Sequence, residues 1–167
     1  KIFPERRILE IKKIKLLSIK YGDLNNLKLE DIHDYLESNL FIIFGASFIK
    51  GNLVKFLKKN KAINIHAGIS PYYRGTDCNF WALYDNNPHL VGSTIHLLSD
   101  GLDDGPILYH AMPERRINPF EYTMSAIKSA FISLSQKIEN GTIFKHENYK
   151  QKIANEIRFS KKRDFNS

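Results

Sequence analysis

The stretch from residue 63 to residue 75, INIHAGISPYYRG, constrains the fold more than any other part of the sequence. It reads as a strand followed by a rigid loop containing Gly68 and Pro71. Asn64 and His66 are two residues apart, so an extended chain projects both to one face. An amide donor beside an imidazole at a strand's carboxyl end suits acyl chemistry. The alternative is a core Asn and His satisfied by backbone hydrogen bonds.

A second polar stretch, SDGLDDGPIL, runs from residue 99 to residue 108. Its Asp and Gly residues predict a turn that ends at Gly105-Pro106, between strand-like runs at residues 91–98 and 106–112. By itself this is a hairpin loop with solvated carboxylates. Together with the first stretch, it would supply a carboxylate to Asn64 and His66.

The remaining pattern predicts alternating helices and strands. Residues 40–44, LFIIF, form a continuous apolar run that is typical of a central parallel strand buried on both faces. Amphipathic spacing predicts a helix within residues 27–39, and further helices are expected near residues 52–60 and 76–85. Asn118, Pro119 and Glu121 form a helix start, and Gly141 ends that helix. Its expected core stripe is Phe120, Met124, Ile127, Phe131, Leu134 and Ile138.

The net charge of +7 lies at the two ends of the chain. Residues 1–20 carry about +5 and residues 141–167 about +4, so the middle is slightly acidic. We interpret the ends as solvated segments, with nucleic-acid binding as the alternative. The single cysteine excludes an internal disulfide and a multi-Cys metal site. The absence of a long apolar run and of a signal-peptide pattern indicates a cytoplasmic protein that does not span a membrane.

The order of these motifs resembles the formyltransferase family that uses 10-formyltetrahydrofolate. The resemblance rests on Asn64-x-His66, on residues 70–75 (SPYYRG), on residues 92–96 (GSTIH) and on residues 102–106 (LDDGP). It implies an α/β, Rossmann-like domain with a mostly parallel sheet. The family usually begins with a strand-loop-helix unit that precedes this region, and we expect that unit to be missing here. We therefore expect a catalytic domain over residues 1–141 and a basic segment over residues 142–167.

The resemblance also implies a site. It makes Asn64 the oxyanion donor, His66 the general acid/base and Asp103 the group that orients His66 and relays a proton. Residues implied for folate binding are Phe48, Ile49, Lys50, Gly51, Leu102, Asp104 and Gly105. Residues implied for acceptor binding are Ser70, Tyr73, Arg74 and Gly75. The implied co-substrate is 10-formyltetrahydrofolate, and no metal is expected because no metal-ligand spacing is present.

The resemblance allows several acceptor amines. Tyr73-Arg74-Gly75 resembles the sugar and tRNA branches of the family, so our first choice is a nucleotide-linked amino sugar. The alternatives are methionyl-tRNA and glycinamide ribonucleotide. A catalytically idle homologue that serves as a binding module remains a further alternative. The sequence makes no prediction about the oligomeric state.

Overall fold

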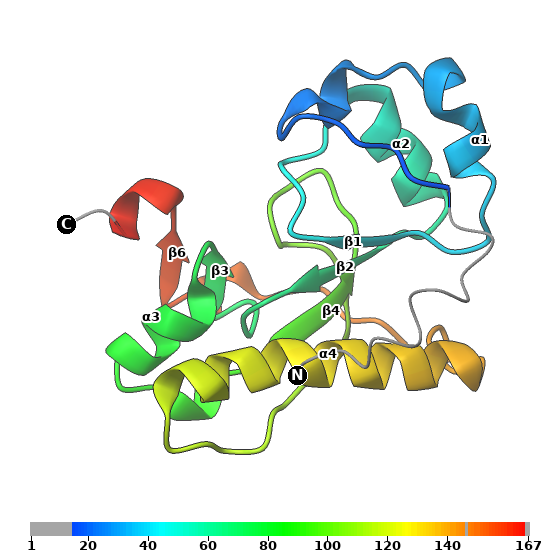
Figure 1. The fold of residues 1–167 in the computed structure, drawn as a ribbon. Helices are drawn as coiled ribbons and strands as arrows, with labels where there is room; N and C mark the ends of the chain where they lie inside the picture. Colours follow the sequence, from blue (N-terminus) through cyan, green and yellow to red (C-terminus); the bar gives the residue numbers. More distant parts are fainter. Residues whose placement is uncertain (1–14, 146, 166–167) are drawn as a thin grey trace.

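A four-stranded sheet in the order β1-β2-β4-β5 forms the centre of the molecule (Figure 1). The computed structural model describes residues 15–145 and 147–165. The strands are β1 (Ile42–Phe44), β2 (Ile63–His66), β4 (Ser93–Leu97) and β5 (Ile107–Ala111). Helices alternate with these strands along the chain, so the predicted α/β class is confirmed.

The sheet is mixed in direction. β1 and β2 are parallel, whereas β4 is antiparallel to both β2 and β5. The expectation of a mostly parallel sheet therefore holds only for the β1–β2 pair of this sheet. For β4 and β5 the physical reason is the short loop that joins them, because neighbouring strands joined by a short loop run in opposite directions. This hairpin is the one predicted from the turn residues.

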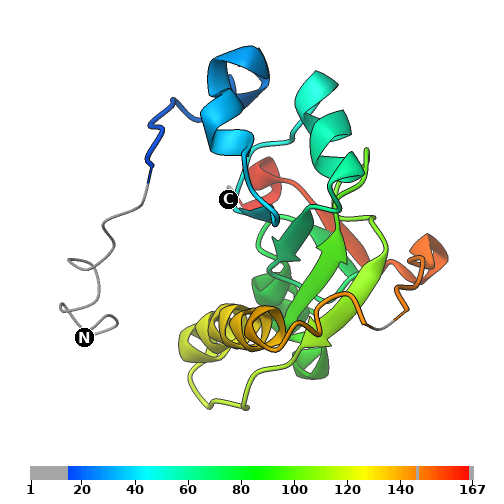
Figure 2. The ribbon, with the colours of Figure 1, turned by 90° about the vertical axis from the view of Figure 1, so that its right-hand side faces the viewer.

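Helices cover both faces of the sheet (Figures 1 and 2). Helix α2 (Gly51–Lys59) lies on one face, where Leu53 and Leu57 pack with Ala62. Helix α4 (Pro119–Glu139) lies on the other, where Ala130 and Leu134 pack with the isoleucines of β2 and β4. Asn118 Oδ1 accepts a hydrogen bond from the Glu121 N–H, which confirms the predicted start of α4.

The stripe predicted to bury α4 is largely wrong. Phe120 is 72% exposed and Phe131 is 43% exposed, and of the predicted stripe only Leu134 is fully buried. The buried positions are Tyr122, Ala126, Ala130 and Leu134. These recur every fourth residue, and the alanines let the helix approach the sheet closely. The large side chains consequently occupy the flank of the helix.

Strand β1 also differs from its prediction. It is parallel to β2, as expected, but it is the outermost strand of the sheet in the described part of the chain. Ile42 and Phe44 are each 45% exposed, although Phe44 contacts the ring of Phe131 edge-on. An apolar run by itself does not distinguish a central strand from an outer one.

The C-terminal segment is part of the same fold. Strand β6 (Arg158–Ser160) pairs in parallel with β3 (Tyr73–Gly75), the strand that precedes α3 (Cys78–Tyr84). The expected boundary at residue 141 is therefore not a structural boundary. Short helical turns complete the described chain: η1 (Asp23–Asn26), η2 (Glu30–Ile32), α1 (His33–Leu36), η3 (Pro88–Leu90), η4 (Ile153–Asn155) and η5 (Lys162–Phe165).

The helix predicted within residues 27–39 is shorter than expected. It consists of η2 and the single turn α1, although Ile32 is buried against α2 as the amphipathic spacing predicts. Among the residues that the structure describes, no helix is both long and apolar enough to cross a membrane.

Candidate active site

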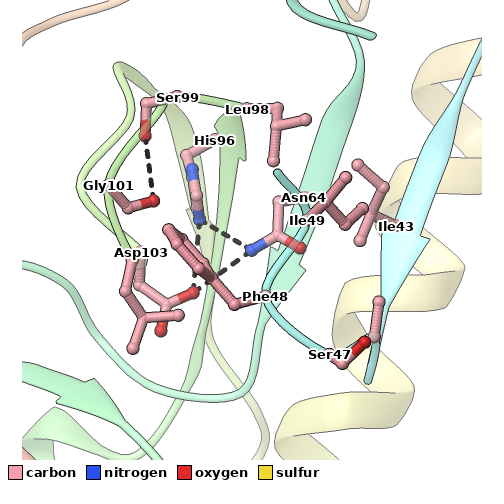
Figure 3. A pocket seen from close by; sticks show the side chains of 12 residues that line it. Ile43, Ser47, Phe48, Ile49, Asn64, His96, Leu98, Ser99, Gly101 and Asp103 are labelled. Carbon is pink, nitrogen blue, oxygen red and sulfur yellow. Dashed lines mark hydrogen bonds and ion pairs between the residues drawn. The ribbon is translucent and has the colours of Figure 1, made fainter. Parts of the chain in front are cut away.

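Strands β2 and β4 bring two polar side chains together at the sheet's surface. They are antiparallel, and Asn64 lies opposite His96 in their register. The Asn64 Nδ2 atom is 2.9 Å from His96 Nε2. The loop that leaves β4, residues 98–105, then returns over both side chains and adds Asp103 (Figure 3). We call it the Asp103 loop.

Hydrogen bonds determine the orientation of the Asn64 amide and the tautomer of His96. His96 Nδ1 lies 2.9 Å from the Leu97 carbonyl oxygen, so Nδ1 carries the proton and Nε2 is an acceptor. Asn64 Nδ2 donates to this Nε2 and, at 3.3 Å, to Asp103 Oδ1. A substrate oxygen would most easily replace Asp103 Oδ1 as the acceptor of the longer of these two hydrogen bonds. His96 lies in the GSTIH motif but was not among the predicted site residues, and the structure places it in the site.

The Asp103 carboxylate connects the elements of the site. Its Oδ2 lies 3.3 Å from His66 Nδ1 and 3.3 Å from the Gly75 backbone nitrogen, which donates to it. Burial would raise the pKa of Asp103, but His96, His66 and the Gly75 N–H together hold that pKa below its usual value. The carboxylate is therefore ionised at neutral pH. Asp103 has a φ of 51°, a left-handed conformation that few residue types tolerate.

His66 lies behind Asp103 rather than in the pocket. It is buried, and its Nε2 is 3.0 Å from the Tyr73 carbonyl oxygen. Burial lowers the pKa of His66, against opposing effects of Asp103 and the Tyr73 carbonyl, so the ring is neutral at pH 7. Both ring nitrogens face oxygen acceptors, and an imidazolium would have both of its N–H groups paired. The ring can thus accept a proton that reaches it through Asp103.

A pocket of about 70 Å³ opens above Asn64, His96 and Asp103 (Figure 3). Its lining is Ile43, Ala46, Ser47, Phe48, Ile49, Asn64, His96, Leu98, Ser99, Gly101, Leu102 and Asp103. Three of the seven residues predicted for folate binding are in this set: Phe48, Ile49 and Leu102. Apolar side chains thus form most of the walls, and Asn64, His96 and Asp103 lie together (Figure 3).

The other four residues predicted for folate binding have structural partners. Lys50 donates its backbone N–H to Asn25 Oδ1 at 2.7 Å, and Gly51 begins helix α2. Asp104 bonds to the Ser99 hydroxyl within the loop. A Cβ at Gly105 would lie 1.8 Å from the Leu97 carbonyl oxygen, so this position requires glycine for close packing. None of the four lines the pocket.

The residues predicted for acceptor binding support the Asp103 loop or the core. The Tyr73 side chain is 1% exposed and its hydroxyl bonds to Asp85 and Asn87, so the expected acceptor contact of this side chain is wrong. Arg74 bonds to Glu156 at 2.8 Å and to the Leu102 carbonyl at 2.6 Å.

Ser70 and Gly75, the other two, also contact the loop. The Ser70 hydroxyl lies 3.5 Å from the Asp103 carbonyl oxygen, and Gly75 donates to the Asp103 carboxylate. Gly75 has a φ of 94°, and a Cβ there would lie 1.9 Å from the Ser160 carbonyl oxygen. This position therefore requires glycine on both grounds.

Two further titratable groups lie near the site. Burial raises the pKa of the Cys78 thiol. Burial lowers the pKa of His110, whose Nε2 lies 3.0 Å from the Ser70 carbonyl oxygen. Within residues 15–145 and 147–165, no three His, Cys, Asp or Glu side chains are grouped so as to hold a metal ion.

Comparison with known proteins identifies relatives of this domain. Residues 27–139 match the family described as "Formyl transferase". The chain is 33% identical over 127 residues to the methionyl-tRNA formyltransferase of Thermotoga neapolitana, covering 71% of this chain and 39% of that protein. It is 31% identical over 88 residues to mitochondrial formyltetrahydrofolate deformylase 2 of Arabidopsis thaliana, covering 52% of this chain and 26% of that protein. The chain thus spans well under half the length of these two relatives.

A solved structure has the same architecture. The formyltransferase PseJ from Anoxybacillus kamchatkensis, in complex with UDP-4,6-dideoxy-4-formamido-L-AltNAc and tetrahydrofolate, superimposes with a TM-score of 0.59 at 25% identity. The match covers 90% of this chain and 72% of PseJ. The family model alone spans more than half of the chain. This chain belongs to the formyl transferase family.

Proposed function

We propose that this chain is the catalytic domain of an enzyme that transfers the formyl group of 10-formyltetrahydrofolate to a primary amine. The observation that carries the proposal is the meeting of Asn64, His96 and Asp103 in a pocket whose other lining residues are mostly apolar. This arrangement offers a neutral donor for a carbonyl oxygen and an ionised carboxylate for a proton.

Asn64 is suited to stabilise the negative charge that develops on the formyl oxygen. In the reaction the amine nitrogen bonds to the formyl carbon, the bond from that carbon to folate N10 breaks, the amine loses a proton and N10 gains one. Charge therefore accumulates transiently on the formyl oxygen. Since an amide N–H needs no change in protonation to donate, and His96 fixes its direction, Asn64 is a preorganised donor.

Asp103 is suited to receive the proton of the amine. Its carboxylate lines the pocket, and its pKa is held below the usual value, so it is ionised when the amine arrives. His66 adjoins it from the buried side and can share the proton because both of its ring nitrogens face acceptors. We therefore assign Asp103 to the proton transfer and His66 to its support.

The chemical nature of the pocket lining suits the folate ring. Phe48, Ile49 and Leu102 supply apolar walls for a flat heterocycle, and the polar end of the pocket adjoins them. At about 70 Å³ the pocket is smaller than the roughly 300 Å³ or more of typical ligand sites. Phe48 and Leu102 are 42% and 40% exposed, so a ligand that covers them would bury apolar surface.

For the acceptor we propose a nucleotide-linked amino sugar. The support is PseJ, which was solved in complex with a UDP-linked formamido sugar and whose match covers most of both chains. The guanidinium of Arg74 bonds to Glu156 and to the Leu102 carbonyl, so we do not assign it a contact with the acceptor. Methionyl-tRNA is the second candidate because that activity is in the name of the Thermotoga relative.

A parallel assay tests the proposal. The intact protein would be incubated with 10-formyltetrahydrofolate and one of four partners: a UDP- or dTDP-linked amino sugar, glycinamide ribonucleotide, charged initiator tRNA, or buffer alone. We expect the formylated sugar as product, and a loss of about 10²–10³-fold in kcat for Asn64→Ala. The exposed Asn155→Ala is the matched control.

Each other result has a defined meaning. Preferential formylation of tRNA or of the ribonucleotide would refute the sugar proposal while leaving formyl transfer intact. Formate release in buffer alone, with no formylated amine, would indicate hydrolysis of the folate instead. Absence of every product from the folded protein would refute the catalytic proposal.

A further inference from the structure

The C-terminal segment, residues 147–160, lies against the outer side of the site. Tyr149 exchanges two backbone hydrogen bonds with Ile107 at the start of β5, with lengths of 2.9 and 3.1 Å. At its other end the segment becomes β6 and pairs with β3. It therefore bridges two strands, and the Asp103 loop lies between its two points of attachment.

Gln151 holds the Asp103 loop from this segment. Its amide nitrogen lies 2.9 Å from the Asp103 carbonyl oxygen and 2.8 Å from the Gly105 carbonyl oxygen. Two carbonyl acceptors require an amide nitrogen with two hydrogens, so the orientation of this amide is determined by the contacts. The opposite atom, Oε1, is buried without a hydrogen-bond partner among the described residues. Gln151 therefore acts here as a double donor only.

A second contact from the same segment acts on the adjacent part of the loop. Glu156 accepts from Arg74 Nη1 at 2.8 Å, and Arg74 Nη2 donates to the Leu102 carbonyl at 2.6 Å. The carbonyls of residues 102, 103 and 105 thus all accept from side chains that are in the segment or bound to it. Asp103 lies at the centre of this set.

Asp103 needs such support because its conformation is unfavourable and its carboxylate has several partners. A φ of 51° persists in a residue other than glycine only where its surroundings enforce it. Its two oxygens contact Asn64, His66 and Gly75, each at 3.3 Å. A displacement of about 1 Å would break these contacts, and such errors are costly for catalysis.

We propose that Gln151 is a positioning residue, which holds the backbone on both sides of Asp104 so that the Asp103 carboxylate reaches Asn64 and His66. The consequence for turnover rests on the proposed formyl transfer. The placement of Asp103 does not, and it can be measured without any substrate.

The first experiment follows the titration of His66 by NMR in protein labelled with nitrogen-15. Gln151→Met keeps the volume of the side chain and removes both donors, and Lys152→Ala alters an exposed neighbour as a control. The groups that face His66 are Asp103, His96, Arg74 and the Tyr73 carbonyl. Because Asp103 raises the pKa of His66, its displacement should lower that pKa further in Gln151→Met. An unchanged titration would overturn the proposal.

The second experiment measures turnover with the accepted amine. We expect kcat to fall about tenfold in Gln151→Met while KM for both substrates stays within about twofold, and Lys152→Ala to match the wild type. A fall in melting temperature with unchanged kcat and unchanged His66 titration would show a merely structural role and refute the proposal. If Gln151→Met does not fold, Gln151→Asn shortens the side chain by one methylene, and the same two readouts apply.

The two proposals fail separately. If the wild type forms no product but the His66 titration shifts in Gln151→Met, formyl transfer is refuted and the positioning of Asp103 by Gln151 stands. If the wild type is active and Gln151→Met leaves both kcat and the titration unchanged, the positioning proposal alone is refuted.

Discussion

The Asp103 loop and the loop of residues 45–50, which we call the Phe48 loop, form opposite walls of one pocket but are held differently. Side chains of Ser70, Arg74 and Gln151 bond to the backbone of the Asp103 loop. In the Phe48 loop, the described side chain that bonds to the backbone is Asn25, which accepts from the Lys50 N–H and donates to the Phe48 carbonyl, both at 2.7 Å.

The difference in how the two loops are held corresponds to the function that we propose for each wall. A group that moves a proton must be placed within a few tenths of an ångström, whereas an apolar wall needs only to cover a ring. Many contacts from separate segments enforce the first requirement. A single side chain is sufficient for the second and leaves Phe48 able to yield to a ligand. We therefore predict that changes at the Asp103 loop affect kcat, and that changes at the Phe48 loop affect KM.

The largest effect is expected for Asp103→Asn. Asparagine tolerates the left-handed conformation of this position, so the fold should persist while the proton acceptor is lost. Steady-state kinetics should show a fall in kcat of about 10²–10⁴-fold. The control is Asp100→Asn, since the Asp100 carboxylate is 71% exposed and pairs with Lys58. A kcat within threefold of the wild type in Asp103→Asn would contradict the assigned role.

A smaller loss is expected for Arg74→Met. This change removes the donor to the Leu102 carbonyl and leaves Glu156 without its partner. A hydrogen bond to a charged group contributes about 1.5–3 kcal/mol, so kcat should fall by roughly 10-fold to 100-fold. The exposed Arg115→Met serves as control. If instead KM for the amine rises while kcat is maintained, Arg74 binds the acceptor and our reassignment is wrong.

Asn25→Ala is expected to act mainly on folate binding. It removes two hydrogen bonds from the Phe48 loop, each contributing about 0.5–1.5 kcal/mol. KM for the folate should rise by roughly tenfold, with kcat within about twofold of the wild type. Asn26→Ala is a suitable control, because Asn26 bonds to Asp23 rather than to this loop. Equal losses in kcat and in folate affinity in Asn25→Ala would contradict the proposed difference between the two walls.

The smallest effect is expected in the pH dependence of stability. The groups responsible for it lie on the Asp103 side of the pocket. His66 and His110 have pKa values lowered by burial, so the unfolded chain binds more protons than the folded one below about pH 6.5. Stability should therefore decrease as the pH is lowered from 7 toward 5. The lowered pKa of Asp103 adds stability that is lost only at still lower pH, as the carboxylate becomes protonated.

Thermal unfolding at pH 7.5 and 5.5 measures this effect. We expect the melting temperature to fall by several degrees, since 1 kcal/mol corresponds to about 2–4 °C for a domain of this size. His110→Gln retains a donor for the Ser70 carbonyl but cannot be charged, so the decrease should be smaller in this variant. His89→Gln, at an exposed position, should behave as the wild type. Equal pH dependence in all three proteins would contradict the assignment.

Part of the fold was predictable because it depends on neighbouring residues. The hairpin of β4 and β5 follows from the turn residues between them, and the start of α4 follows from Asn118 and Glu121. Predictions that depended on burial were less accurate. The apolar run of β1 was expected at the centre of the sheet but lies at its edge in the described part of the chain, and the exposed flank of α4 was expected to be its core face. Residue type alone does not indicate which face an element presents to its neighbour.

The candidate site also has a part that was predictable from the sequence and a part that was not. The sequence by itself determined that Asn64 and His66 share a strand face, that Asp103 lies in the following hairpin loop, and that these motifs resemble one family. Only the tertiary structure decided the contacts among them. It placed His96 against Asn64, turned Arg74 inward and brought Gln151 to a carbonyl 48 residues away in the sequence. Strand direction and turns depend on interactions a few residues apart, whereas partners so distant meet only when the sheet and its covering segments have assembled.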